Sequence, residues 1–166
     1  MKKPERSADR KELLALVIAK GFSCTEMARH VLGAQWTALD QGERTEFVQL
    51  FRLILLKTYL HHIDRYAYQY LEYLEERTAH GRTLVRTRLM ARDRDVVLDF
   101  WLFERAGEWK VYDVVVKGMS LIQNYRGQFT RVLRNSSYPH LVERMRETAC
   151  LPDCNEQAVL GDHPPG

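Results

Sequence analysis

The chain has 166 residues, the size of one ordinary domain, and its 45% hydrophobic and 28% charged residues are typical of a globular fold. Its 25 basic residues are interspersed with 22 acidic ones, which leaves a net charge of +3. A nucleic-acid-binding protein more often concentrates its basic residues on one face, so we expect no nucleic-acid partner.

The N-terminal segment has the charge of a secretory signal but not its apolar region. Residues 1–11 are positively charged, and no apolar stretch follows them. Two alternatives stay open: a cytosolic protein, or an exported one whose leader has been removed and replaced by a start methionine. The longest apolar stretch, 50–60, contains Arg52 and Lys57 and falls short of the roughly 20 apolar residues of a transmembrane helix, so we expect a protein that does not span a membrane.

Two short helices are predicted first along the chain. Residues 8–20 have the apolar period of an amphipathic helix, which ends at a glycine. A second helix is predicted over 23–33. Ser23 and Glu26 have the spacing of a capping box at its start, and Gly33 fits its end.

A third and longer helix of about 25 residues is predicted after Asp40. Asp40 and Glu43 have the spacing of another capping box. The apolar stripe of this helix recurs every three or four residues and consists of Phe47, Phe51, Ile54, Leu55, Thr58, Tyr59 and His62. Its length makes it the main helix of the domain.

The apolar period changes near Tyr68, where a run of four strands begins. They are predicted at 68–78, 82–93, 95–105 and 108–118, with turn signals at 80–81, 92–95 and 106–107. Because the connections are short, the strands should form an antiparallel meander. The third strand is apolar on both faces except at Asp99, which fits a strand covered by helices on both sides or one that lines an internal cavity.

Two helices are predicted after the strands. Ser120 and Gln123 have capping-box spacing before a helix over 121–134. The last helix begins near Ser137, with Pro139 in its first turn. The fold class is therefore α+β: an about four-stranded twisted antiparallel sheet wrapped by about five helices.

One domain is expected over 8–149, with flexible termini at 1–7 and 150–166. Cys150 and Cys154 lie close enough in sequence to form a small disulfide loop, and three free thiols are the alternative. No His/Cys pair has zinc-ligand spacing nearby, and the chain contains neither a nucleotide-binding glycine loop nor a nucleophile elbow. We therefore expect no metal and no cofactor.

Asp99 and Asp113 are embedded in apolar strands. Burial of an unpaired carboxylate is costly, so each must reach solvent or find a hydrogen-bond donor. A catalytic acid or base with a raised pKa is one interpretation. The other is structural, with Asp113 bound by backbone N–H groups or by an arginine.

Three segments resemble the MlaC family of periplasmic phospholipid-binding proteins, also called toluene-tolerance auxiliary proteins of Gram-negative bacteria. They are MARHVLGAQW (27–36), LDQGERTEFVQLFRLILLKTYL (39–60) and the stretch over 109–146. The last is the most specific and places Asp113, Gly118, Ser120, Leu121, Asn124, Tyr125, Arg126 and Phe129 in the family pattern. A related group tied to hopanoid biosynthesis shares this layout.

The resemblance implies a periplasmic carrier whose sheet and helices surround a deep apolar pocket for lipid acyl chains, with the headgroup at the mouth. It implies no enzymatic step, and an export signal that has been removed. It also implies docking to an outer-membrane lipoprotein complex and to an inner-membrane ABC transporter complex.

The predicted pocket residues rest on periodicity and on this resemblance. They are Phe47, Phe51, Leu55, Tyr59, Val85, Leu89, Trp101, Val114, Val116, Tyr125 and Phe129. We also hypothesise that Arg126 or Tyr125 hydrogen-bonds Asp113 or a neighbouring carbonyl and locks strand to helix, while the alternative for Arg126 is contact with a headgroup phosphate.

Three alternative functions remain. One is a small α+β enzyme that acts on an apolar substrate through Asp113 or Asp99. Another is a hopanoid-related lipid-binding protein. The third is a partner-binding module whose aromatic residues form a solid core without a cavity.

Overall fold

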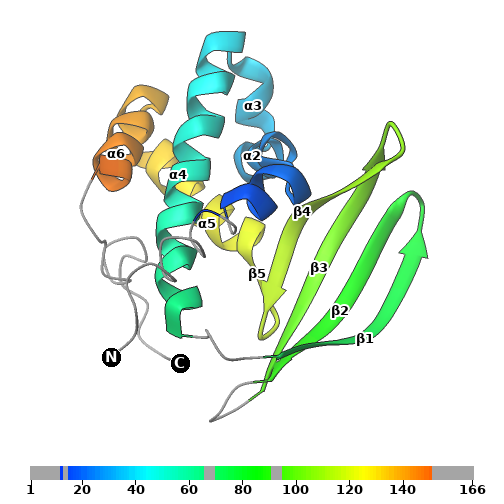
Figure 1. Cartoon of the computed structure of the whole chain (residues 1–166). Helices are drawn as coiled ribbons and strands as arrows, with labels where there is room; N and C mark the ends of the chain where they lie inside the picture. Colours follow the sequence, from blue (N-terminus) through cyan, green and yellow to red (C-terminus); the bar gives the residue numbers. More distant parts are fainter. Residues whose placement is uncertain (1–11, 13–14, 66–69, 91–94, 151–166) are drawn as a thin grey trace.

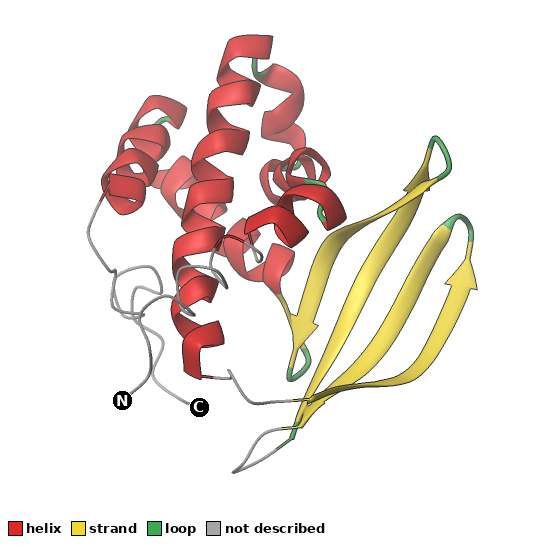
Figure 2. Ribbon diagram, viewed as in Figure 1, coloured by secondary structure: helices red, strands yellow, loops and turns green. Residues whose placement is uncertain are grey.

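The computed structural model describes residues 12, 15–65, 70–90 and 95–150 of the chain, and for 59–65 the backbone alone (Figure 1, Figure 2). Residues 15–21 are helical and precede α2 (Cys24–Leu32), α3 (Ala34–Ala38) and α4 (Gln41–Arg65). The strands are β1 (Tyr70–Ala79), β2 (Arg82–Met90), β3 (Val96–Arg105), β4 (Glu108–Val116) and β5 (Met119–Ser120). Two helices follow, α5 (Leu121–Asn135) and α6 (Tyr138–Cys150). The predicted α+β class is confirmed.

The strands form one antiparallel sheet in the order β1-β2-β3-β4-β5, which confirms the predicted meander. The prediction of about four strands missed β5, whose two residues pair with Val115 and Val116. Three turns place both central residues at positive φ: His80–Gly81, Ala106–Gly107 and Lys117–Gly118. Turns of this mirror-image kind match the twist of antiparallel strands and so help to fix their register.

Side-chain caps mark the predicted helix starts. At the start of α4, the Asp40 carboxylate accepts the N–H of Glu43 at 2.8 Å, and the Glu43 carboxylate accepts the N–H of Asp40 at 2.9 Å. The Ser23 hydroxyl accepts the N–H of Glu26 at the start of α2, and Gly33 ends that helix at a φ of 56°. The five-residue α3 that follows was not predicted, because so short a segment has no periodic apolar stripe.

An aromatic cluster joins the helices. Phe47 and Phe51 of α4 contact Tyr125 and Phe129 of α5, with ring centroids 5.1 to 6.2 Å apart. Buried aliphatic residues of α2 and α6 surround the cluster: Met27, Val31, Leu32, Leu141 and Met145. The helices α2, α4, α5 and α6 thus each bury a stripe of residues three or four apart, and removal of these stripes from water stabilises the packing.

Helices and sheet meet at one edge of the sheet. α2 and α5 pack against β4, α5 also contacts β5, and α4 packs on α2 and α6. In Figure 1, β4 and β5 lie next to the helices and β1 lies farthest from them. Within the described ranges, none of the helices combines the length and the apolar character needed to cross a membrane.

The termini predicted to be flexible, 1–7 and 150–166, lie outside the described residues, except that Cys150 is the last residue of α6. The predicted partner of a disulfide, Cys154, lies outside them as well. The expectation of a single domain over 8–149 stays a prediction.

Candidate functional site

One face of the sheet carries a row of half-buried apolar side chains, which we call the apolar sheet face. Paired residues of antiparallel strands lie on the same face, so the register places Val85 beside Phe100, and Phe100 beside Val114. The row consists of Val85, Leu89, Leu98, Phe100, Val114 and Val116, each of them half-buried. Four predicted pocket residues from two strands, β2 and β4, therefore come together on one surface.

The opposite face of the sheet is charged toward its free edge. There Arg86 donates from Nε and Nη2 to the two carboxylate oxygens of Asp99, at 2.8 and 2.9 Å, and its Nη1 lies 3.3 Å from Glu75 Oε1. Trp101, which was predicted to line the pocket, pairs with Asp113 and so lies on this opposite face. The opposite face is thus charged near Arg86 but also carries the half-buried apolar residues Leu84, Trp101 and Val115. The apolar sheet face has no charged residue in its row, and its apolar surface favours a cover of protein or ligand.

Asp99 does not have the environment of a catalytic acid or base. The hydrogen bonds from Arg86 lower the pKa of its carboxyl below the ordinary value, and this effect exceeds the opposing effect of burial. A general base in an apolar strand requires the opposite, a raised pKa. The catalytic interpretation of Asp99 is therefore not supported, and its role is to pair with Arg86.

Asp113 joins β4 to the start of α5. Its Oδ2 accepts a hydrogen bond from the Ser120 hydroxyl at 2.6 Å, and its Oδ1 accepts the backbone N–H of Ile122 at 3.1 Å. The same Ser120 oxygen accepts the N–H of Gln123 at 3.0 Å and caps α5. A helix N-terminus presents free N–H groups and a positive dipole, so a carboxylate is stabilised there. The strand is thus joined to the helix, but through Ser120 and Ile122 instead of the hypothesised Arg126 or Tyr125.

Arg126 points away from this junction. Its guanidinium lies over Gly33 at the end of α2, where a Cβ would come within 3.3 Å of Arg126 Nη2. Tyr125 points into the core, where its hydroxyl hydrogen-bonds to Thr58 and burial raises the pKa of the phenol. Contact of Arg126 with a headgroup phosphate stays a prediction.

The predicted pocket residues on helices lie in the packed core. Phe47, Phe51, Leu55, Tyr125 and Phe129 are all buried in one cluster of the described residues. The side chain of Tyr59 lies outside the described part of the chain. Their contact with a ligand stays a prediction. The six residues of the apolar sheet face are half-buried and so have surface left to cover, although Thr83, Thr87 and Val96 on the same face are buried.

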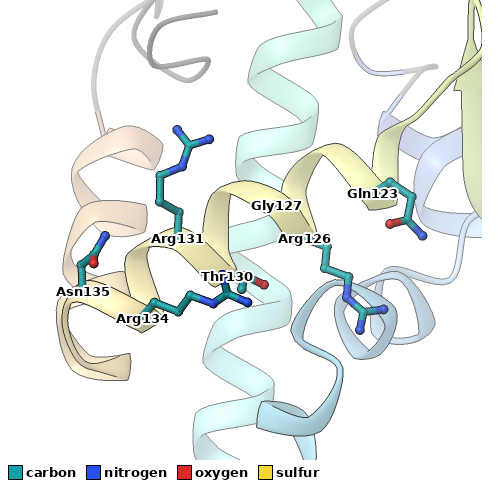
Figure 3. A pocket seen from close by; sticks show the side chains of 7 residues that line it. All are labelled: Gln123, Arg126, Gly127, Thr130, Arg131, Arg134 and Asn135. Carbon is teal, nitrogen blue, oxygen red and sulfur yellow. The ribbon is translucent and has the colours of Figure 1, made fainter.

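Two adjoining hollows on the helical side were not foreseen. The larger, about 620 Å³, is open to the surface and runs along α5 (Figure 3); it is lined by Gln123, Arg126, Gly127, Thr130, Arg131, Arg134 and Asn135. The second, about 480 Å³, lies where α2, α3 and α4 meet, and Arg126 borders both. The signal for the first was the composition of α5, which contains arginines and no acidic residue. In the described residues, no group of His, Cys, Asp or Glu side chains could hold a metal ion.

Known proteins resemble the chain both in sequence and in fold. A model of the MlaC protein family matches residues 1–147. The intermembrane phospholipid transport system binding protein MlaC of Haemophilus influenzae is 22% identical over 128 residues, or 74% of this chain and 60% of that protein's length. A phospholipid-binding protein of Ralstonia solanacearum, solved in complex with a phospholipid, matches with a TM-score of 0.77 at 20% identity, over 89% of this chain and 86% of that one. This last likeness shows a shared fold.

Proposed function

The chain belongs to the MlaC family, and from this premise we propose that it is a periplasmic carrier of phospholipid. Acyl chains lie against the apolar sheet face, and the headgroup stays toward solvent. The observation that carries the proposal is that row of half-buried apolar side chains, which the sheet brings together from β2, β3 and β4. The relatives named above, one of them solved with a phospholipid bound, support the class of ligand.

The energetics of such a carrier favour exchange over tight capture. Transfer of one acyl chain of about 14 methylenes from water to an apolar site is worth roughly 11 kcal/mol, at about 0.8 kcal/mol for each CH₂. The lipid, however, moves from one apolar environment, the bilayer, to another, the protein. The net free energy of exchange is therefore close to zero, so the same protein both loads and unloads.

Direction of transport must come from partners. We propose that the carrier moves lipid between an outer-membrane lipoprotein complex and an inner-membrane ABC transporter complex. The name of the Haemophilus influenzae relative, which places that protein in an intermembrane phospholipid transport system, supports this assignment.

Native mass spectrometry of freshly purified protein, followed by solvent extraction, tests the ligand. We expect a stoichiometric added mass that resolves into phospholipid. If the extract contained a hopanoid, the cargo would be a hopanoid and not a phospholipid. A bare polypeptide mass that takes up no lipid from liposomes would contradict the carrier function and leave a partner-binding module.

Two neighbouring substitutions locate the site. In Val85→Glu, a carboxylate enters the apolar sheet face, and we expect lipid content to fall while the protein stays folded. Leu84→Glu is the matched control, because Leu84 is also half-buried but pairs with Arg77 and Trp101 on the opposite face. The assignment to this face would be contradicted if both variants lost lipid equally, or if neither variant lost lipid.

A further inference from the structure

The exposed surface of α5 is positively charged without a counter-charge. Arg126, Arg131 and Arg134 are all exposed on this helix, and α5 contains no Asp or Glu. None of the three forms an ion pair with any carboxylate in the part of the chain that the structure describes. We call the residues that line the larger hollow the α5 basic face: Gln123, Arg126, Gly127, Thr130, Arg131, Arg134 and Asn135.

Acidic side chains on α2 and at the start of α4 already have partners within the protein. Glu26 on α2 lies 3.4 Å from both Arg29 and His30. Asp40 and Glu43 bind each other's backbone N–H groups at the start of α4. The positive charge of the α5 basic face is thus left for a molecule from outside.

The shape of the α5 basic face suits an extended acidic segment. In Figure 3, Arg126 and Arg134 extend from one side of α5 and Arg131 from the other, so guanidinium groups border the hollow on two sides. Between them Gly127 has no side chain, and a Cβ at this position would meet nothing within 4 Å. Gln123, Thr130 and Asn135 add donors and acceptors that can bind a peptide backbone.

We propose that the α5 basic face is a docking surface for an acidic segment of a partner protein. This inference rests on the proposed carrier function, which requires transient contact with membrane complexes. Arginine forks bind carboxylates in pairs, and exposed ion pairs give fast, salt-sensitive association more than tight binding. A carrier that must leave each partner after transfer needs that combination.

A protein partner fits this surface better than a membrane does. Surfaces that insert into bilayers combine basic residues with exposed aromatic or leucine side chains. Large exposed apolar side chains occur elsewhere in the described residues, including Tyr70, Leu71 and Tyr73 on β1. None of them lines the α5 basic face.

The test measures binding of a short fluorescein-labelled peptide that alternates glutamate and serine, with the glutamine version as its control. The variant carries Arg126→Gln, Arg131→Gln and Arg134→Gln. Its matched control carries Arg77→Gln, Arg88→Gln and Arg105→Gln, which remove the same charge from the sheet. We expect the first variant to bind about tenfold more weakly at about 0.1 M salt, and the control to bind like the wild type.

Each outcome separates the possibilities. Equal binding by the wild type and the α5 variant, or binding of the glutamine peptide as well as the glutamate one, would overturn the proposal. So would α5-dependent binding to vesicles that contain phosphatidylglycerol without binding to the acidic peptide. Native mass spectrometry keeps the two proposals apart. A second variant with only Arg131→Gln and Arg134→Gln leaves the predicted headgroup contact of Arg126 in place, and we expect it to retain lipid and still to bind the acidic peptide more weakly than the wild type. Wild type without lipid contradicts the carrier function alone.

Discussion

Asp113 illustrates how a carboxylate is accommodated in an apolar strand. Each of its two oxygens accepts one hydrogen bond, from Ser120 and from the N–H of Ile122, and both donors belong to the β5–α5 junction. The side chain therefore exchanges water for two donors and the positive end of a helix, which offsets the cost of burial. Its role is to fix the angle at which α5 leaves the sheet.

Replacement of Asp113 by Asn should destabilise the protein. The amide NH₂ would face a donor, leaving one buried group unsatisfied, so we expect the free energy of unfolding to fall by about 1–3 kcal/mol. Urea denaturation followed by circular dichroism measures the change. Glu108→Gln, at the exposed start of β4, is the control and should change stability by less than about 0.5 kcal/mol. An Asp113→Asn variant with the same unfolding free energy as the wild type would contradict the role of the junction.

The Arg86–Asp99 pair predicts a pH dependence. Because Arg86 lowers the pKa of Asp99 in the folded state, the pair stabilises the protein above the ordinary pKa of aspartate. That contribution is lost as the pH falls through the folded-state pKa. We expect the difference in unfolding free energy between wild type and Asp99→Asn to be constant near neutral pH and to shrink below about pH 4. A difference that grows on acidification would show that the pKa is raised instead.

At the scale of elements, α5 has two sides with different tasks. Ile122, Tyr125 and Phe129 are buried in the core, while Arg126 and Arg134 lie on the exposed side. Gly127 is also on the exposed side, in the interior of the helix. Glycine lowers helix stability there, because it loses more backbone freedom on folding than alanine does.

Gly127→Ala should therefore stabilise the protein. A Cβ would meet nothing within 4 Å, so we expect a gain of about 0.5–1 kcal/mol in unfolding free energy, measured by thermal or urea denaturation. Gly118→Ala is the comparison and should not stabilise the protein, because Gly118 has a φ of 81° and alanine is strained in that region. Loss of stability in Gly127→Ala would mean that α5 is distorted at this position.

Elements with a strong period or cap could be predicted from sequence, and those fixed by distant partners could not. The stripe of α4 and the Asp40–Glu43 box are local patterns, so the start of this helix was found. β5 exists only because its two residues meet Val115 and Val116 across a turn. The structural interpretation of Asp113 expected a backbone N–H donor, and the N–H of Ile122 confirms it. The Ser120 hydroxyl was not predicted as a donor to Asp113, although Ser120 was recognised as a cap.

In the whole molecule, the helical core and the apolar sheet face are two separate sets of apolar residues. The core is a cluster of buried aromatic and aliphatic side chains, some of which line a hollow of about 160 Å³, and the residues of the apolar sheet face are half-buried. Sequence periodicity could identify both sets of apolar residues, and it placed Phe51 and Val85 in one predicted pocket. It could not show that Phe51 is fully buried among helices, because that depends on how α4 and α5 cross.

Phe51→Ala tests the part played by the core. Phe51 contacts three other aromatic rings, so we expect its removal to lower the free energy of unfolding by about 3–5 kcal/mol. The measurement is urea denaturation, with and without extraction of any bound lipid. An equal loss in both preparations assigns Phe51 to the core, whereas a loss confined to the lipid-loaded protein assigns it to the ligand.

The attachment of the sheet through β4 and β5 has a mechanical consequence. α2 and α5 hold that edge, while β1 lies farthest from them, so the sheet is a plate clamped along one side (Figure 1). A small rotation of the sheet about its attached edge, near Asp113 and Ser120, displaces β1 the most, because β1 lies farthest from that edge. The distance between the free edge and the helices can then change to admit or release a long molecule while every strand pair stays intact.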